Sequence, residues 1–281
     1  MLVTDFIPFW YLVTMALGFG VIIGSFLNVY IYRFHTGKSL SGSSHCLSCQ
    51  SPLRFYDLLP ILSYLALRGR CRCCSAYIPS RYLWVELVTG LLFVAIVLVQ
   101  PLWWLWPWYA VLVSLLVVVA VYDLYHLVIP QAFVNTLFLL AVVLLAYKWW
   151  VLPSGFMLGS AVLGGLLGYL FFWSLWKYSE GRWIGYGDAK LAVPLGLMLG
   201  LMGAFSMLVL SFWIGTLISL TLLAGQWLRS RRGQVRLPFG SKTLTMKSEV
   251  PFAPFLIIGF LAVFLGGVDV LTLVSYAIPT F

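Results

Sequence analysis

Charged residues are scarce in this sequence, and acidic residues are the scarcest of them. Of 281 residues, 9% are charged and only eight are Asp or Glu, whereas 62% are hydrophobic. The mean hydropathy of +1.01 lies far outside the balance of a soluble globular domain. The composition therefore excludes such a domain and predicts a polytopic membrane protein.

Motifs that mark several enzyme classes are missing as well. The sequence contains no Gly-x-Ser-x-Gly nucleophile elbow and no His-Glu-x-x-His zinc pattern. It also lacks a phosphate-binding loop and the glycine fingerprint of dinucleotide sites. No convincing internal repeat or low-complexity tract is present. A serine hydrolase, a zinc protease and a nucleotide-dependent enzyme therefore gain no support.

Eight hydrophobic runs are long enough to cross roughly 30 Å of bilayer hydrocarbon as helices. They cover residues 6–32, 82–100, 102–122, 131–150, 155–177, 188–203, 204–228 and 253–277. The predicted fold is an all-α polytopic integral membrane protein with eight transmembrane helices.

The runs divide the chain into three predicted parts. Residues 1–32 form a first transmembrane helix, residues 33–81 a cytoplasmic cysteine-rich loop, and residues 82–281 a core of the remaining helices. The first run has no basic flank before it and continues too far for a signal-peptide core. We therefore expect it to remain as a membrane helix.

Basic residues are distributed unevenly around the hydrophobic runs. Of the 17 Lys and Arg residues, all but Lys148 lie on the side of the loop at 33–81. Because basic loops stay in the cytoplasm, that side is predicted to be cytoplasmic and both termini periplasmic. The net charge of +9 then reflects orientation and attraction to anionic lipid head groups, and it does not predict nucleic-acid binding.

All five cysteines lie in this first polar loop. Four form two pairs with the spacing of a tetrahedral zinc site, namely Cys46 with Cys49 and Cys71 with Cys74. A cytoplasmic loop is reducing, so disulfides are not expected and zinc is favoured over free thiols. Four thiolates leave no coordination position for water, so the predicted metal is structural. Cys73 is spare, either substituting for a neighbour or packing as a small apolar residue.

Two aspartates stand at the ends of long uncharged runs. Asp123 closes the third run, and Asp188 opens the sixth after Gly185 and Gly187. An ionisable residue near hydrocarbon is costly and suggests a functional site, and the topology puts both at cytoplasmic helix ends. If the carboxylates meet, one can hold a proton while the other ionises and activates a shared water. Helix capping by Asp188 remains an alternative.

Other polar residues at the membrane edge have less definite roles. His126 is expected to be a loop or interfacial histidine, and His45 could only replace a missing thiolate. Glu86 is an unexplained charge that could pair with a loop arginine or contribute to a site. Lys190 either holds Asp188 ionised by proximity or snorkels to the interface.

Together, these motifs resemble the type IV prepilin peptidase family, the prepilin leader peptidase/N-methyltransferases. The match runs through Gly24-Ser25-Phe26-Leu27-Asn28-Val29, the two cysteine pairs, Leu62-Ser63-Tyr64-Leu65, Leu67-Arg68-Gly69-Arg70-Cys71, Arg81-Tyr82, Val85-Glu86, Asp123 with Ile129-Pro130, Gly185-Tyr186-Gly187-Asp188-Ala189-Lys190-Leu191, Pro251-Phe252 and Pro254-Phe255-Leu256.

The resemblance implies a bifunctional enzyme of the bacterial inner membrane that acts at the cytoplasmic face. Such enzymes cut the leader from prepilins or pseudopilins of type IV pili and type II secretion, then methylate the new N-terminal amine with S-adenosylmethionine. The resemblance implies that Asp123 and Asp188 are the catalytic aspartates and that the four paired cysteines bind structural zinc. Glu86 and Asn28 are candidates for methyl transfer, and no fingerprint marks the methyl-donor site.

The sequence departs from the family pattern at three positions. Gln131 stands where members often carry an acidic residue, Ala253 interrupts a frequent Pro-Phe-Gly-Pro, and Cys73 is additional. None of them touches the proposed aspartate pair.

On the residues alone, two alternatives stay open: a proton-coupled transporter that uses membrane carboxylates as relays, and a noncatalytic assembly scaffold.

Overall fold

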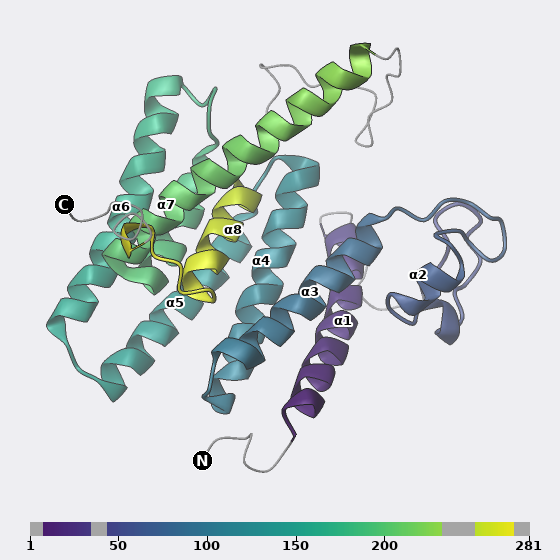
Figure 1. The fold of residues 1–281 in the computed structure, drawn as a ribbon, viewed down its shortest axis with the longest axis horizontal. Coiled ribbons are helices and arrows are strands. Elements are labelled where there is room, and N and C mark those ends of the chain that lie inside the picture. Colours follow the sequence, from purple (N-terminus) through teal and green to yellow (C-terminus); the bar gives the residue numbers. More distant parts are fainter. Residues whose placement is uncertain (1–7, 35–43, 232–250, 273–281) are drawn as a thin grey trace, which may run out of the picture. The chain divides into compact units, whose positions relative to one another are not determined.

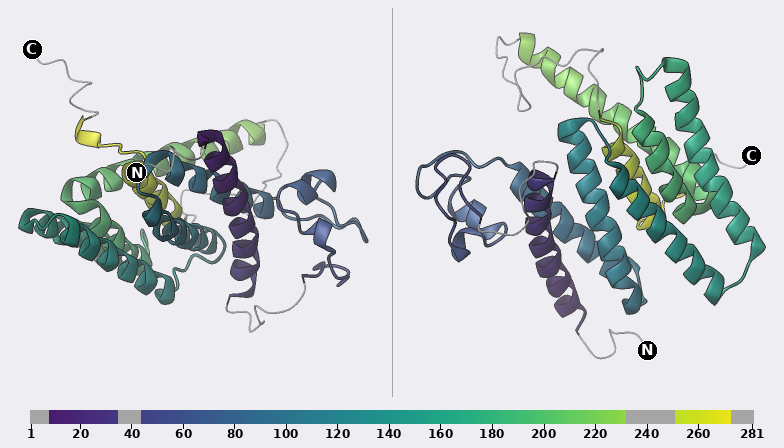
Figure 2. Two further views of the ribbon diagram at one scale, coloured as in Figure 1. Left: turned by 90° about the horizontal axis from the view of Figure 1, so that it is seen from below. Right: turned by 180° about the vertical axis from the view of Figure 1, so that it is seen from behind.

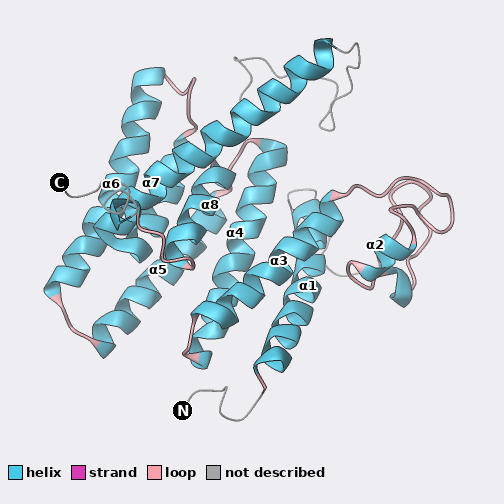
Figure 3. Ribbon diagram, in the orientation of Figure 1, coloured by secondary structure: helices cyan, strands magenta, loops and turns pink. Residues whose placement is uncertain are grey.

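The computed structural model describes residues 8–34, 44–231 and 251–272. In these ranges the chain forms helices and no β-strand, as Figure 3 shows. Both chain termini, which are predicted to be periplasmic, and most of the last basic loop lie outside the described residues. The prediction of an all-α protein is confirmed.

Six helices of the described residues are long and apolar enough to cross a membrane, which fits a multi-pass membrane protein. They are α1 (Phe9–Arg33), α3 (Arg81–Val99), α4 (Trp106–His126), α5 (Gln131–Val151), α6 (Gly155–Ser179) and α7 (Tyr186–Arg231). A further apolar helix, α8 (Ala253–Phe264), has 12 residues, fewer than the roughly 20 that a straight crossing needs. The predicted count of eight crossings therefore stays a prediction.

The sixth and seventh predicted runs form one element, α7, interrupted at Gly200. The backbone there has φ 76° and ψ −178°, a conformation that glycine adopts without steric cost. The hydroxyl of Ser160, on α6, accepts a hydrogen bond from the N–H of Leu201 at 3.0 Å. A side chain of a neighbouring helix thus satisfies a backbone donor next to the interruption.

Small residues let α6 and α7 approach closely. A Cβ atom added at Gly164 would lie 2.5 Å from the carbonyl carbon of Gly200, and one at Gly168 would lie 3.1 Å from the Ala192 Cβ. Glycines at such contacts allow backbone-to-backbone packing, which replaces the hydrophobic driving force that is absent between helices in lipid.

The chain divides into two compact units, residues 1–121 and residues 122–281. In the first unit, α1 packs against α3, as Figures 1 and 2 show. The polar loop that joins them carries a 3₁₀ turn, η2 (Phe55–Asp57), and the short helix α2 (Leu62–Ala66). The predicted division at residues 32 and 81 stays a prediction.

The second unit contains the last turn of α4 and the helices α5 to α8. Within it α5, α6 and α8 each pack against α7 (Figure 1). Fully buried side chains form its core, including Phe172, Leu191, Leu195, Met207 and Phe260. Both aspartates singled out by the sequence belong to this unit.

Candidate active site and metal site

Asp123 lies in the last turn of α4 and is 6% exposed. The helix ends at His126, because Leu127 takes a left-handed conformation (φ 54°) while its N–H donates to the Asp123 carbonyl at 2.9 Å. Pro130 then precedes the first residue of α5 and fixes the chain direction at the turn. The sequence Asp123 to Pro130 thus places a carboxylate at a sharp helix–helix turn.

Asp188 lies in the first turn of α7 and is also 6% exposed. Its backbone N–H donates to the Gly185 carbonyl at 3.2 Å, and its carboxylate lies near the Gly185 backbone, with Oδ2 3.6 Å from a Cβ atom built at residue 185. Gly187 faces Ile129, since a Cβ atom at residue 187 would lie only 3.3 Å from the Ile129 Cβ. The glycines thus bring the start of α7 against the turn that follows α4.

The structure brings the two carboxylates into electrostatic range of each other. Among the described residues, the buried Oδ2 of Asp123 and Oδ1 of Asp188 have no hydrogen-bond partner. Buried polar atoms without partners are rare in proteins and usually indicate a bound water, a ligand or a catalytic role. The arrangement can hold a water or a substrate amide between two acids.

A third element reaches this pair from far along the sequence. The backbone of Ala253, the first residue of α8, lies near the Asp123 carboxylate. Ala253 has no exposed surface. Sequence reasoning recorded Ala253 only as a departure from a family pattern and missed this contact. The available signal was Pro254, because proline is frequent in the first turn of a helix.

Lys190 has other partners than Asp188. Its ammonium donates to Gln131 Oε1 at 2.8 Å and lies 4.8 Å from the centre of the Tyr186 ring. Gln131 also donates to the Asn135 side chain at 2.9 Å. The lysine therefore links the start of α7 to the start of α5, next to the aspartates.

His126 is exposed and packs its ring on Tyr122, with ring centres 4.4 Å apart. Its role at the membrane interface stays a prediction.

The four paired cysteines form one cluster, as their spacing predicted. Their Sγ atoms all lie within 4.8 Å of one another, so the cluster could hold a metal ion. The Sγ atoms of Cys46 and Cys74 are 3.8 Å apart, and ligands about 2.3 Å from a tetrahedral zinc would be separated by about 3.8 Å. Cys73 is exposed and does not belong to the cluster.

The two Cys-x-x-Cys turns repeat one backbone geometry. In each turn the N–H of the first cysteine donates at 2.9 Å to a carbonyl beyond the second cysteine. The residue that follows the second cysteine has a positive φ, 58° in one turn and 57° in the other. The corresponding residues are Cys46 and Cys71, Gln50 and Ser75, and Ser51 and Ala76. This similarity is confined to the two short turns around the cysteine pairs.

Local hydrogen bonds favour the thiolate form at two of these positions. The Ser51 hydroxyl lies 3.0 Å from the Cys49 Sγ and, together with the Ser51 backbone, lowers the pKa of Cys49 to about 6. Hydrogen bonds from the backbones of Cys74 and Cys73 lower the pKa of Cys71. Because metals bind the thiolate, these bonds suit the cluster to metal binding.

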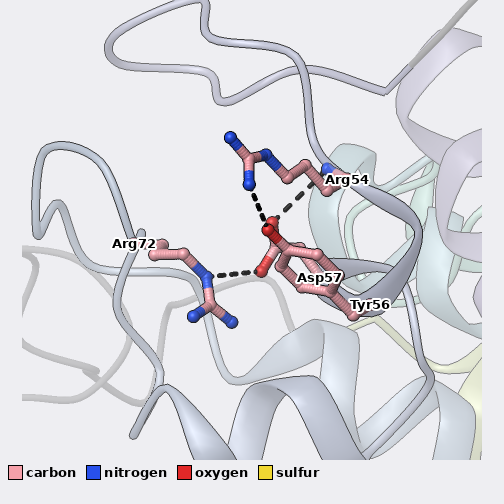
Figure 4. A network of polar contacts seen from close by, with 4 residues as sticks. All are labelled: Arg54, Tyr56, Asp57 and Arg72. Atoms are coloured by element: carbon pink, nitrogen blue, oxygen red, sulfur yellow. Dashed lines mark hydrogen bonds and ion pairs between the residues drawn. The ribbon is translucent and has the colours of Figure 1, made fainter.

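A polar network braces the loop between the two turns (Figure 4). The Arg72 Nε donates to Asp57 Oδ1 at 2.9 Å, and the Arg54 backbone N–H donates to Asp57 Oδ2 at 3.3 Å. The Arg54 guanidinium donates to the Tyr56 hydroxyl at 2.7 Å. Arg72 lies between the cysteines of the second turn, so the network ties that turn to η2.

Glu86 and Asn28 are buried where α1 packs on α3. Glu86 Oε2 accepts the backbone N–H of Ile61 at 2.7 Å, and the Ser25 side chain lies near this carboxylate. Asn28 donates to the Tyr82 carbonyl at 3.0 Å, while its buried Oδ1 has no partner among the described residues. The recorded hydrogen-bond partner of Glu86 is thus a loop backbone, with a serine nearby, and not the loop arginine that was one expectation.

Sequence comparisons agree with this arrangement. Residues 19–100 match the Bacterial Peptidase A24 N-terminal domain, and residues 110–220 match the Type IV leader peptidase family. The chain is 34% identical to a prepilin leader peptidase/N-methyltransferase of Aeromonas hydrophila, over 82% of this chain and 87% of the relative.

Two further relatives cover a similar share of the chain. One is a type 4 prepilin-like proteins leader peptide-processing enzyme of Escherichia coli O78:H11, 32% identical over 79% of this chain and 86% of the relative. The other is a prepilin leader peptidase/N-methyltransferase of Pseudomonas putida, 30% identical over 91% of each chain. No solved structure matches the chain.

Proposed function

Because the chain belongs to the type IV leader peptidase family, we propose that it is a membrane aspartyl endopeptidase that cleaves the leader peptide from prepilins or pseudopilins. The observation that carries the proposal is the pair Asp123 and Asp188, two buried acids with unpartnered oxygens at the ends of two membrane helices. The family assignment confirms the resemblance and displaces the transporter and scaffold alternatives.

The chemistry follows from the pair itself. One carboxylate takes a proton from a water held between the two acids, and the resulting hydroxide attacks the scissile carbonyl carbon. The other, protonated acid donates to the carbonyl oxygen, and a proton then passes to the leaving amine as the peptide bond breaks. The unpartnered Asp123 Oδ2 and Asp188 Oδ1 are suitable acceptors and donors for these transfers.

The depth of the pair suits a substrate with a basic leader and an apolar helix. Such a substrate keeps its leader in the cytoplasm and its helix in the bilayer, so its scissile bond lies at the interface. Asp123 is one turn from the end of α4, and Asp188 is in the first turn of α7, so both belong to helix ends. With basic loops in the cytoplasm, this is the cytoplasmic face of the bacterial inner membrane.

The cysteine cluster is proposed to hold a structural zinc ion. The donor set is four sulfurs at separations that fit tetrahedral coordination. Zinc bound by four thiolates has no position left for a catalytic water, and it would stabilise a loop that has little apolar core of its own.

N-methylation of the new N-terminus is proposed as a second activity, because relatives over most of the chain are named N-methyltransferases. S-adenosylmethionine would supply the methyl group. Glu86 and Asn28 are the candidate residues, since the Glu86 carboxylate and the unpartnered Asn28 Oδ1 are acceptors of the kind that a substrate ammonium requires.

The direct test combines the purified chain, in lipid nanodiscs, with a purified prepilin and S-adenosylmethionine. We expect release of the leader by the parent chain and loss of release in Asp123→Asn and Asp188→Asn. Glu180→Gln is the matched control, because Glu180 is an acid whose side chain is 81% exposed. Intact mass of the product reports cut position and methyl group together. Undiminished release by either aspartate variant would exclude the proposed mechanism.

A further inference from the structure

The polar loop between α1 and α3 carries exposed leucines directly after a residue that is bound to a membrane helix. Ile61 donates its backbone N–H to Glu86 Oε2 on α3 at 2.7 Å, and α2 begins at the next residue, Leu62. We infer that α2 lies in the surface layer of the bilayer, where Leu62 and Leu65 contact the acyl chains of phospholipids. The partner of this part of the loop is thus the lipid itself.

The depth of Glu86 follows from the length of α3. The helix has 19 residues, which at about 1.5 Å per residue give a length of roughly 28 Å. Because the hydrocarbon layer is roughly 30 Å thick, α3 has no residues to spare, and its first residue, Arg81, marks one boundary. Glu86 follows five residues later, about 7.5 Å further along the axis. The Ile61 N–H that Glu86 accepts is therefore within the bilayer.

The packing of α1 gives the same depth. A Cβ atom at Gly24 would lie 2.8 Å from the Glu86 Cα, so these two residues are at one level. Beyond Gly24 the helix continues for nine residues to Arg33, which is about 13 Å of helix. Figures 1 and 2 show α2 alongside α1 and α3. Ile61 is therefore level with the apolar part of both helices.

The backbone around α2 meets the condition that lipid imposes. Hydrocarbon contains no water, so backbone N–H groups there need acceptors within the protein. The N–H groups of Ser63 and Leu65 each donate at 3.0 Å to the carbonyl four residues earlier, and Pro60 has no N–H. The Glu86 carboxylate supplies the acceptor for Ile61. The start of α2 can therefore enter the bilayer without leaving these donors unpaired.

The side chains of α2 divide between an inner and an outer face. Tyr64 faces the loop, since its hydroxyl donates to the Ile78 carbonyl at 3.3 Å and lies 2.9 Å from a Cβ atom built at Gly69. Leu62 and Leu65 are three residues apart, so they share a helix face, and they are 65% and 58% exposed. A leucine gains about 1.5–3 kcal/mol when it is fully withdrawn from water. At this depth the surroundings that withdraw it are acyl chains.

Basic side chains follow α2 and suit the head groups of the same lipids. Arg68 and Arg70 are exposed, and no acid of the described residues forms an ion pair with either. Near a membrane surface each arginine adds about 1 kcal/mol of attraction to anionic lipid. A basic segment, such as the leader of a prepilin, would be repelled here. Leucines and arginines together thus match the acyl chains and the head groups of one phospholipid leaflet.

The test compares leucines of the unaltered chain in nanodiscs of phosphatidylethanolamine and phosphatidylglycerol. Part of the lipid carries a photoactivated diazirine in an acyl chain, and mass spectrometry measures the lipid attached to each leucine. Leu91, which is 55% exposed on α3, is the positive control, and Leu47, which is 49% exposed in the first cysteine turn, is the matched control from the same loop. A parallel sample is oxidised with hydroxyl radicals, which report access to water.

We expect acyl-chain label at Leu62 and Leu65 within about 3-fold of Leu91 and at least about 5-fold above Leu47, because acyl chains are confined to the hydrocarbon layer. Oxidation should follow the opposite order, with Leu47 the highest. Less acyl-chain label than this overturns the inference. Strong oxidation would then show that water covers α2, and weak oxidation that protein, such as a second copy of the chain, covers it.

Discussion

Gly187 lies against Ile129 so closely that a Cβ atom at residue 187 would be 3.3 Å from the Ile129 Cβ. This contact joins the start of α7 to the turn after α4, and each of these segments carries one of the two aspartates. The distance between the acids is therefore set partly by the absence of a side chain at residue 187.

Gly187→Ala should separate activity from stability. Alanine is the better helix former by about 1 kcal/mol, so thermal stability should hold or rise. The added methyl must displace Ile129 by a few tenths of an ångström, and the rate of leader release should fall by about 10-fold, because catalytic geometry tolerates little displacement. Kinetics and thermal melts in nanodiscs measure the two effects.

Gly159→Ala is the control, since nothing lies within 4 Å of a Cβ atom at that position. It should share the helix-propensity gain and leave the rate unchanged. A parental rate in Gly187→Ala would show that this contact does not set the aspartate geometry.

Gln131→Glu should strengthen the link between α5 and α7. The Lys190 ammonium already donates to Gln131 at 2.8 Å, so a carboxylate at residue 131 forms an ion pair in the same place. Exposed ion pairs add only about 0.2–1 kcal/mol, so we expect a small rise in Tm and little change in cleavage.

Salt provides the check on that effect. The rise in Tm should vanish near roughly 1 M salt, because the Debye length there is about 3 Å. Lys190→Met in the Gln131→Glu background removes the partner and should abolish the gain. A rise that survives both tests is not electrostatic.

Metal content should follow the cluster of four sulfurs. The parent chain and Cys73→Ser should each retain one zinc per chain by elemental analysis, because Cys73 lies outside the cluster. Cys49→Ser or Cys74→Ser should reduce zinc retention and make the loop between α1 and α3 more sensitive to protease. Loss of zinc from Cys73→Ser with retention in Cys74→Ser would reverse the ligand assignment.

Glu86→Ala should release the polar loop from the membrane helices. The carboxylate accepts the N–H of Ile61, a β-branched residue with an unfavourable positive φ (60°), and holds the entry to α2. Leaving that buried donor unsatisfied costs about 1–3 kcal/mol. Hydrogen exchange should accelerate around α2 in Glu86→Ala and much less in Glu86→Gln, which keeps an acceptor oxygen. Equal exchange in both variants argues against the anchor.

Features local to the sequence were predictable. Asp123 and Asp188 were identified because a charge next to a long apolar run is costly, and the orientation of the helices put both at one membrane face. The cysteine cluster followed from spacing alone, because two Cys-x-x-Cys turns are what a tetrahedral metal requires.

Features that depend on packing were not predictable in the same way. Ala253 comes near Asp123 only after α8 packs on α7. The local sequence around either residue does not indicate that the other is close. The two cysteine turns share backbone hydrogen bonds, such as that from Cys46 to Ser51. Apart from the cysteines, few residue types are the same in the two turns, so the sequence did not indicate their common geometry. The interruption at Gly200 lies just before the boundary predicted between residues 203 and 204, and an apolar run that continues through it does not mark its position more closely.

The interruption at Gly200 divides α7 into two helical segments, so α7 is not one continuous helix. A continuous helix of this length would transmit bending at its C-terminal end to Asp188 at its N-terminal end. The Ser160 hydroxyl accepts the N–H of Leu201 beside the interruption, so we expect tilting of the distal segment to be absorbed there. We therefore expect movements of the distal segment of α7 to reach Asp188 less than they would through a continuous helix.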